Sequence, residues 1–173
     1  MSVLQPLEKS LAEALKGVPA LPPGAKKALV EFVPWINLVF GLLALASVYW
    51  LWQWAHVANN AINYLNNLSV TYGGGQVVSN RLGFTVWLAL AVLTVQAVII
   101  LAAILPLKDR KKSGWDLLFY ALILQVVYGV VVAFTAYGIG HLFSSLIGVA
   151  IGLYFLFQIR DAYLKQPAAN KKV

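Results

Sequence analysis

The sequence contains no cysteine, a single methionine and few charged residues. Without cysteine the chain can form no disulfide, no thiolate zinc site, no iron–sulfur ligation and no thiol nucleophile. Charged residues make up 11% of the 173 residues, whereas hydrophobic residues make up 61%. A soluble domain carries about 25% charged residues. The composition therefore predicts that lipid surrounds much of the chain.

Charge is absent from two long stretches, 82–107 and 117–159, and is concentrated between them in the segment 106–114. Long charge-free stretches are typical of membrane spans, and a dense charge cluster cannot lie in hydrocarbon. We therefore predict that 106–114 is a short loop at a membrane surface. The basic residues expected to fix its side of the membrane and to contact lipid headgroups are Lys108, Arg110, Lys111 and Lys112.

Four apolar segments are predicted to span the membrane as a single domain, 33–159. They cover 35–57, 82–105, 115–137 and 141–159, each close to the ~20 residues that cross ~30 Å of hydrocarbon. With four spans, every Lys and Arg except Arg81 falls on one side. The positive-inside rule then places both termini in the cytoplasm and the chain in the inner cell membrane. The net charge of +7 follows from this topology, so no nucleic-acid partner is expected.

The predicted fold class is all-α: an integral membrane four-helix bundle with two additional amphipathic helices. The first lies in a cytoplasmic arm, 1–32, where Leu4, Leu7, Leu11 and Leu15 recur at helical spacing. It packs on the membrane or the bundle, or it binds a partner. The second is a short helix on the outer interface within 58–82. Residues 160–173 are expected to form a basic cytoplasmic tail.

A few polar and small residues inside the spans are candidates for helix contacts. Gln96 and Gln125 are predicted to reach the same depth and to bond to one another, because an unpaired amide in hydrocarbon is costly. Alternatively, they line a path for a small solute. The predicted bundle polar contact comprises Gln96, Gln125, Tyr128 and Thr135. The small residues expected to pack against the third span, or against a second copy, are Ser144, Gly148 and Gly152.

The spans carry no ionisable group at mid-depth and no catalytic motif, so no enzyme activity and no cofactor is expected. The two histidines lie at the ends of predicted spans. His56 ends the first span and His141 opens the fourth, which places both near the outer surface. There they serve as interfacial polar residues, with haem or metal ligation as the alternative.

Two segments, 111–120 and 145–160, resemble small polytopic proteins of bacterial membranes to which no activity is assigned. The resemblance covers about a third of the chain. It implies a bacterial cytoplasmic membrane and the same four-span layout, and it carries over no functional residue.

The function expected from these features is that of a non-enzymatic scaffold or accessory subunit, acting through contacts with membrane proteins or lipids. One alternative is a small transporter or channel for a neutral solute. The other is an electron-transfer protein that binds haem or a metal through its two histidines. The expected partners are membrane lipids together with another membrane protein or further copies of the chain.

Overall fold

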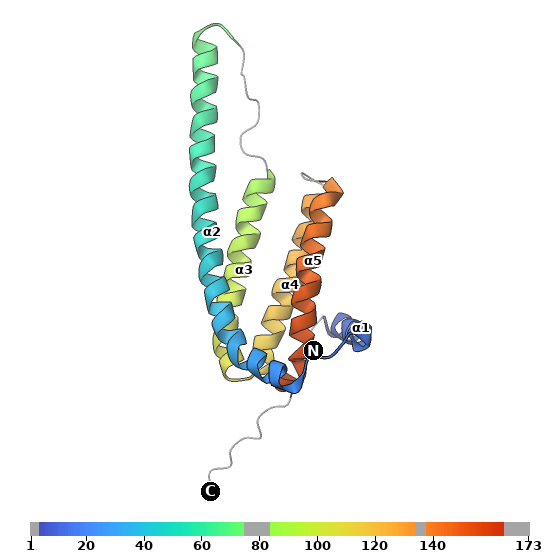
Figure 1. Cartoon of the computed structure of the whole chain (residues 1–173). Helices are drawn as coiled ribbons and strands as arrows, with labels where there is room; N and C mark the ends of the chain where they lie inside the picture. The colour runs from blue at the N-terminus through green and yellow to red at the C-terminus, as the bar shows by residue number, and fades with distance from the viewer. Residues whose placement is uncertain (1–3, 75–83, 134–137, 165–173) are drawn as a thin grey trace.

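The computed structural model describes residues 4–74, 84–133 and 138–164, which are almost entirely helical, and no strand occurs within these ranges. The helices are α1 (Gln5–Ala14), the 3-10 helix η1 (Leu15–Gly17), α2 (Pro23–Thr71), α3 (Phe84–Lys108), α4 (Lys112–Val132), α5 (Gly138–Gln158) and α6 (Arg160–Leu164). Helices α2 to α5 run alternately up and down, and α1 lies beside the lower end of α5 (Figure 1). The all-α prediction is confirmed.

Three of these helices, α2, α3 and α4, are long and apolar enough to cross a membrane. Within α5, the apolar stretch whose side chains are described is Leu146–Gln158. The outward faces of the helices expose large apolar side chains, such as Trp50 at 71% and Leu105 at 72%. Such broad apolar faces are typical of helices in contact with lipid or with other apolar helices.

Helix α2 differs from the predicted boundaries at both ends. It begins at Pro23, so the last part of the predicted arm 1–32 belongs to this helix. It also continues through 58–71, where a separate interfacial helix was predicted, and that prediction is wrong. No proline or glycine occurs between Gly41 and Gly73, so nothing in this stretch interrupts the helix. Pro34 lies inside α2, and the N-terminal part of this helix is curved (Figure 1).

Two further helix boundaries differ from the predicted ones. Helix α3 continues past Pro106 to Lys108, because a proline removes one hydrogen bond and bends a helix without having to end it. Residues 160–164, predicted as the start of a polar tail, form α6. Tyr163 in α6 is fully buried, so this helix belongs to the packed part of the molecule.

The connection between α3 and α4 is a tight turn. The N–H of Arg110 donates to the carbonyl of Leu107 at 3.0 Å, and the N–H of Lys111 donates to that of Pro106 at 2.8 Å. Arg110 adopts a φ of 54°, the left-handed conformation common just after a helix. A Cβ added to Gly114 would lie 2.6 Å from the Leu107 nitrogen. Glycine therefore permits the start of α4 to approach the end of α3.

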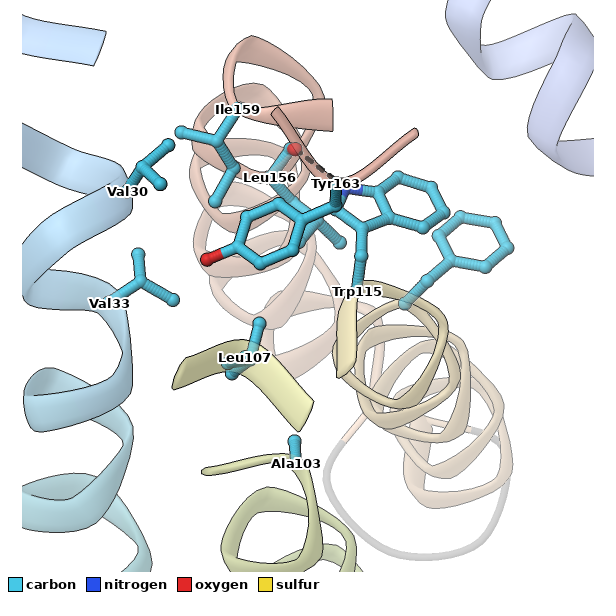
Figure 2. Packing of buried hydrophobic residues seen from close by; sticks show 9 residues of the cluster. Val30, Val33, Ala103, Leu107, Trp115, Leu156, Ile159 and Tyr163 are labelled. Carbon is cyan, nitrogen blue, oxygen red and sulfur yellow. Dashed lines mark hydrogen bonds between the residues drawn. The ribbon is translucent and has the colours of Figure 1, made fainter. Parts of the chain in front are cut away.

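The main apolar core lies at the end of the molecule that carries this turn. Its buried residues are Val30, Val33, Ala103, Leu107, Trp115, Phe119, Leu156, Ile159 and Tyr163. Figure 2 shows Val30 and Val33 of α2 facing Ile159 and Tyr163, with Leu107 below them. The Tyr163 hydroxyl has no hydrogen-bond partner among the described residues. Burial raises the pKa of this hydroxyl above its ordinary value.

The long helices pack in chain order, α2 on α3, α3 on α4 and α4 on α5. Gly41 makes the first of these contacts close, since a Cβ there would lie 2.5 Å from the Leu101 side chain. Helices α2 and α5 instead face each other across a groove. The described helices therefore form an open row, and the predicted four-helix bundle is not confirmed.

Candidate functional site

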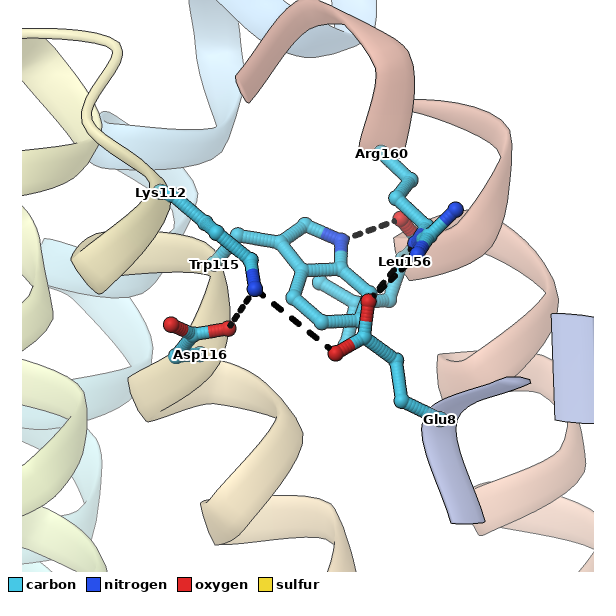
Figure 3. A network of polar contacts seen from close by, with 6 residues as sticks. All are labelled: Glu8, Lys112, Trp115, Asp116, Leu156 and Arg160. Carbon is cyan, nitrogen blue, oxygen red and sulfur yellow. Dashed lines mark hydrogen bonds and ion pairs between the residues drawn. The ribbon is translucent and has the colours of Figure 1, made fainter. Parts of the chain in front are cut away.

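The first component of the candidate site is a buried carboxylate on the N-terminal helix. Glu8 in α1 is only 6% exposed. One of its oxygens accepts from Arg160 Nε at 2.9 Å, and its other oxygen lies 3.8 Å from Lys112 Nζ. Lys112 also lies 3.7 Å from Asp116 (Figure 3). Glu8 therefore joins α1 to α6 and to the start of α4.

Glu8 was not recognised in the sequence as a member of the apolar face of its helix. It follows Leu4 by four residues and precedes Leu11 by three, so it occupies the same face as these leucines. Leu4 and Leu11 both pack against the buried core. A carboxylate among inward-facing leucines predicts a buried ionic partner, and this spacing was the signal that could have revealed it.

Trp115 supports the basic partner of Glu8. Its ring is fully buried, and its Nε1 donates to the carbonyl of Leu156 at 2.8 Å. The ring stacks on Phe119 with centroids 5.4 Å apart, and the Arg160 guanidinium lies 5.8 Å from the Trp115 centroid. Arg160 is thus placed between a carboxylate and an aromatic ring, an arrangement that fits its planar, weakly hydrated cation.

The segment between η1 and α2 is attached to α5. The Pro19 carbonyl accepts from the Tyr154 hydroxyl at 3.0 Å and from Gln158 Nε2 at 3.3 Å. The N–H of Leu21 donates to Gln158 Oε1 at 3.2 Å. The arm is therefore held on the helical row along its length, in agreement with one of the two placements expected from its leucine spacing.

The second component is the groove between α2 and α5, with a volume of about 840 Å³. Its walls are mostly apolar and include Phe40 and Leu43 of α2 and Phe155 of α5. Its floor comes from α3 and α4. Val33, Leu156 and Ile159 belong both to the groove lining and to the buried core, so the core closes one end of the groove.

The predicted polar residues fall into three groups. Gln96 and Gln125 are half-buried and both line the groove. No hydrogen bond joins the two amides, both of which lie in the described part of α3 and α4. Tyr128 is half-buried in α4 but is not among the groove residues. Thr135 lies outside the described residues. Asn37 of α2, which sequence reasoning did not single out, lines the same groove.

The predicted small residues of α5 have different surroundings. A Cβ on Gly152 would lie 2.9 Å from the Leu122 side chain, so α5 packs closely on α4 at this point. Gly148 has no neighbour within 4 Å of such a Cβ and faces the groove. Ser144 lies in α5, and its side chain is outside the described part of the structure.

The two histidines lie in α2 and α5. His56 is exposed and packs edge-on against Trp52, with ring centroids 4.4 Å apart. His141 lies in α5, outside the part of the chain with described side chains. Among the described residues, no three metal-ligating side chains gather in one place.

The basic residues Lys108, Arg110 and Lys111 at the α3–α4 connection are exposed, and Lys111 pairs with Asp109 at 2.8 Å.

Comparisons with protein-family models, with curated proteins and with solved structures found no match for this chain. The resemblance to small polytopic bacterial proteins therefore stays a prediction.

Chemically, the described residues form an ionic cluster at one end of the molecule and a mostly apolar groove beside it. The first holds an arm in place, and the second is suited to an apolar occupant.

Proposed function

We propose that this chain is a multi-pass protein of the inner cell membrane with four spans, both termini on the basic side and no catalytic activity. It acts as a scaffold or accessory subunit through lateral contacts inside the membrane. The observation that carries this proposal is the open row of helices, which leaves the apolar walls of α2 and α5 uncovered. Because lipid chains fill such a groove only loosely, an apolar helix would gain packing contacts there.

The ionic cluster supports the orientation that we propose. Lys112, which directly follows the α3–α4 turn, and Arg160 both pair with Glu8 of α1, at the end of the molecule where α1 lies (Figure 1). Basic residues gathered at one end match the positive-inside rule, and anionic headgroups on that side would neutralise the exposed members.

Photocrosslinking from the groove tests the proposal. A photoreactive phenylalanine analogue at Phe40 or Phe155, both groove residues, is expected to form discrete protein adducts in intact membranes. The same analogue at Trp35, which is 60% exposed on α2 and absent from the groove lining, is the matched control. Adducts with lipid alone at all three positions would contradict the proposal.

A second candidate function is a pathway for a small neutral solute. The half-buried amides of Gln96 and Gln125, together with Asn37, give the groove a polar strip that lipid contact alone does not require. Equilibration of a neutral solute into vesicles containing the purified protein, abolished by Gln96→Leu, would favour this candidate over the scaffold.

Ligation of haem or a metal by His56 and His141 stays the third alternative, and an absorption spectrum of the purified protein tests it.

A further inference from the structure

Helix α2 is much longer than a membrane requires. Its 49 residues span roughly 73 Å at 1.5 Å per residue, whereas the hydrocarbon layer is ~30 Å thick. Trp52 of α2 contacts Trp87, which lies one turn into α3. Residues beyond about position 56 therefore lie past the first residue of α3. Figure 1 shows this upper part of α2 rising above the ends of α3, α4 and α5.

The projecting part and the two turns of α2 just below it carry an exposed stripe at a regular spacing of three and four residues. We call it the α2 seam, and its members are Trp50, Trp54, Val57, Ala61, Tyr64 and Leu68. Among its large side chains, Trp50 is 71% exposed, Trp54 is 55%, Val57 is 68% and Tyr64 is 65%. Exposed asparagines occupy another face of the helix at Asn60, Asn63 and Asn67. Such a stripe, apolar at a repeat of 3.5 residues, is the pattern of a helix that pairs with a second helix in a left-handed supercoil.

Lipid cannot cover the seam over its whole length. An amphipathic helix covers its apolar face by lying flat in the headgroup layer. Here the stripe belongs to the same unbroken helix as the apolar segment below it, so it cannot lie flat while that segment crosses the membrane. A protein surface of matching length is needed instead.

We infer that the α2 seam pairs, in parallel, with the α2 seam of a second copy of this chain. A second copy inserted with the same topology presents the same stripe at the same height and in the same direction. Residues 32–74 carry no Asp, Glu, Lys or Arg, so two copies meet along the seam without like-charge repulsion. This inference rests on the membrane placement proposed above and names the first partner of that scaffold.

The available area is sufficient for such a pair. An aromatic side chain buries 150–250 Å² when fully covered, so Trp50, Trp54 and Tyr64 at their present exposures offer on the order of 300–400 Å² per copy. A stable interface needs ~800 Å² per partner. The stripe continues at the same spacing into the groove through Ser47, Leu43 and Phe40, of which Leu43 is 56% and Phe40 is 59% exposed. The seam and the groove wall together supply the remaining area.

Cysteine scanning tests the inference directly, because the chain contains no cysteine of its own. Single substitutions Val57→Cys, Ala61→Cys, Tyr64→Cys and Leu68→Cys are oxidised in native membranes, and dimer yield is measured on gels. A disulfide requires Cα atoms within ~7 Å, so these positions should give several-fold more dimer than the controls. The matched controls are Asn60→Cys, Asn63→Cys and Asn67→Cys, which are exposed on the same helix.

Two further measurements separate failure of the inference from failure of the membrane proposal. Tyr72→Cys, at a site that is 85% exposed, is labelled in intact cells with a maleimide that cannot cross membranes. If Tyr72→Cys reacts from outside and dimer yield shows no seam periodicity, the inference is overturned while the membrane placement stands. If Tyr72→Cys is protected, or the protein is absent from the membrane fraction, the proposed membrane placement is wrong. The inference, which rests on that placement, is then overturned as well. Seam cysteines that form disulfides with a different polypeptide would also overturn the inference.

Discussion

At the residue scale, one position limits how closely two helices can meet. Gly114 lies where the first turn of α4 passes the last turn of α3, and a Cβ there would lie 2.6 Å from the backbone nitrogen of Leu107. Backbone cannot move aside as a flexible side chain can. The close packing of Trp115 and Leu107 in the core depends on this approach.

Gly114→Ala should therefore destabilise the protein by about 1–3 kcal/mol, because the added methyl group forces the α3–α4 turn apart. Thermal unfolding in mild detergent measures the change. Gly24→Ala is the control, since a Cβ at Gly24, in the first turn of α2, meets nothing within 4 Å. That variant should be neutral or slightly stabilising. Equal stability of both variants would show that α3 and α4 are not in such close contact.

Glu8 illustrates how a single charge can position a whole helix. The carboxylate is nearly buried, and the side chains of its partners Arg160 and Lys112 are 24% and 39% exposed. Removing one member of a buried ion pair leaves the other uncompensated, at a cost of up to 3–5 kcal/mol. Because Arg160 retains some solvent contact, the cost here belongs at the lower end of that range.

Glu8→Gln should release α1 from the row of helices and make the segment from η1 to α2 a better protease substrate. The rate of cleavage there, followed by mass spectrometry, measures the effect. Glu13→Gln, an exposed carboxylate on the same helix, should leave the rate unchanged. Unchanged cleavage in Glu8→Gln would mean that the leucines of α1 alone hold the arm.

At the element scale, the helices are packed in a row with the amides of Gln96 and Gln125 at its centre. Both were expected to bond to one another, since equal depth on adjacent helices suggested contact. Equal depth does not fix the direction of a side chain around its helix. Both side chains line the groove between α2 and α5, where the neighbouring walls are mostly apolar.

Replacing Gln96 or Gln125 by leucine should change the free energy of unfolding by less than about 1 kcal/mol, because no intrachain hydrogen bond joins the two amides. Unfolding in detergent with a denaturant series tests this. Trp115→Phe is the positive control, because it removes the bond to the Leu156 carbonyl and should cost about 1–2 kcal/mol. A loss in the glutamine variants as large as in the control would indicate that the two amides do pair.

Some elements could be predicted from the sequence and others could not. The leucine spacing of α1 correctly predicted a helix, and the charge cluster between α3 and α4 correctly predicted a short connection. Both predictions depend only on local periodicity and charge. The unbroken course of α2 through 58–71 was missed because its five asparagines suggested an interface, although asparagine only weakly disfavours helix. The pairing of Glu8 with Arg160 and the bond from Trp115 to Leu156 depend on tertiary placement, which no local pattern encodes.

At the scale of the whole molecule, the charged elements and the projecting part of α2 lie at opposite ends. The basic turn, Arg160 and the arm lie at one end, and the uncharged upper part of α2 extends from the other. If the chain spans the membrane as proposed, the first end faces the cytoplasm and the second faces outward.

Because the chain has no cysteine of its own, the labelling of single introduced cysteines reports its orientation in the membrane. Tyr72→Cys should react with an impermeant maleimide in intact cells, whereas Lys9→Cys, exposed on α1, should react only after permeabilisation. The two labelling yields, compared before and after permeabilisation, give the orientation. Labelling of Lys9→Cys in intact cells would reverse the proposed topology.

The bond between Glu8 and Arg160 joins residues that are 152 positions apart in the chain. A ribosome must therefore complete α1 to α5 before Glu8 can pair with Arg160. Until then, the Glu8 carboxylate has only Lys112 of α4 as a basic partner. A chain truncated before Arg160 would lose this ion pair but would keep the hydrogen bonds of Pro19 to Tyr154 and Gln158, so the Glu8–Arg160 pair is the last of these contacts to become available during synthesis.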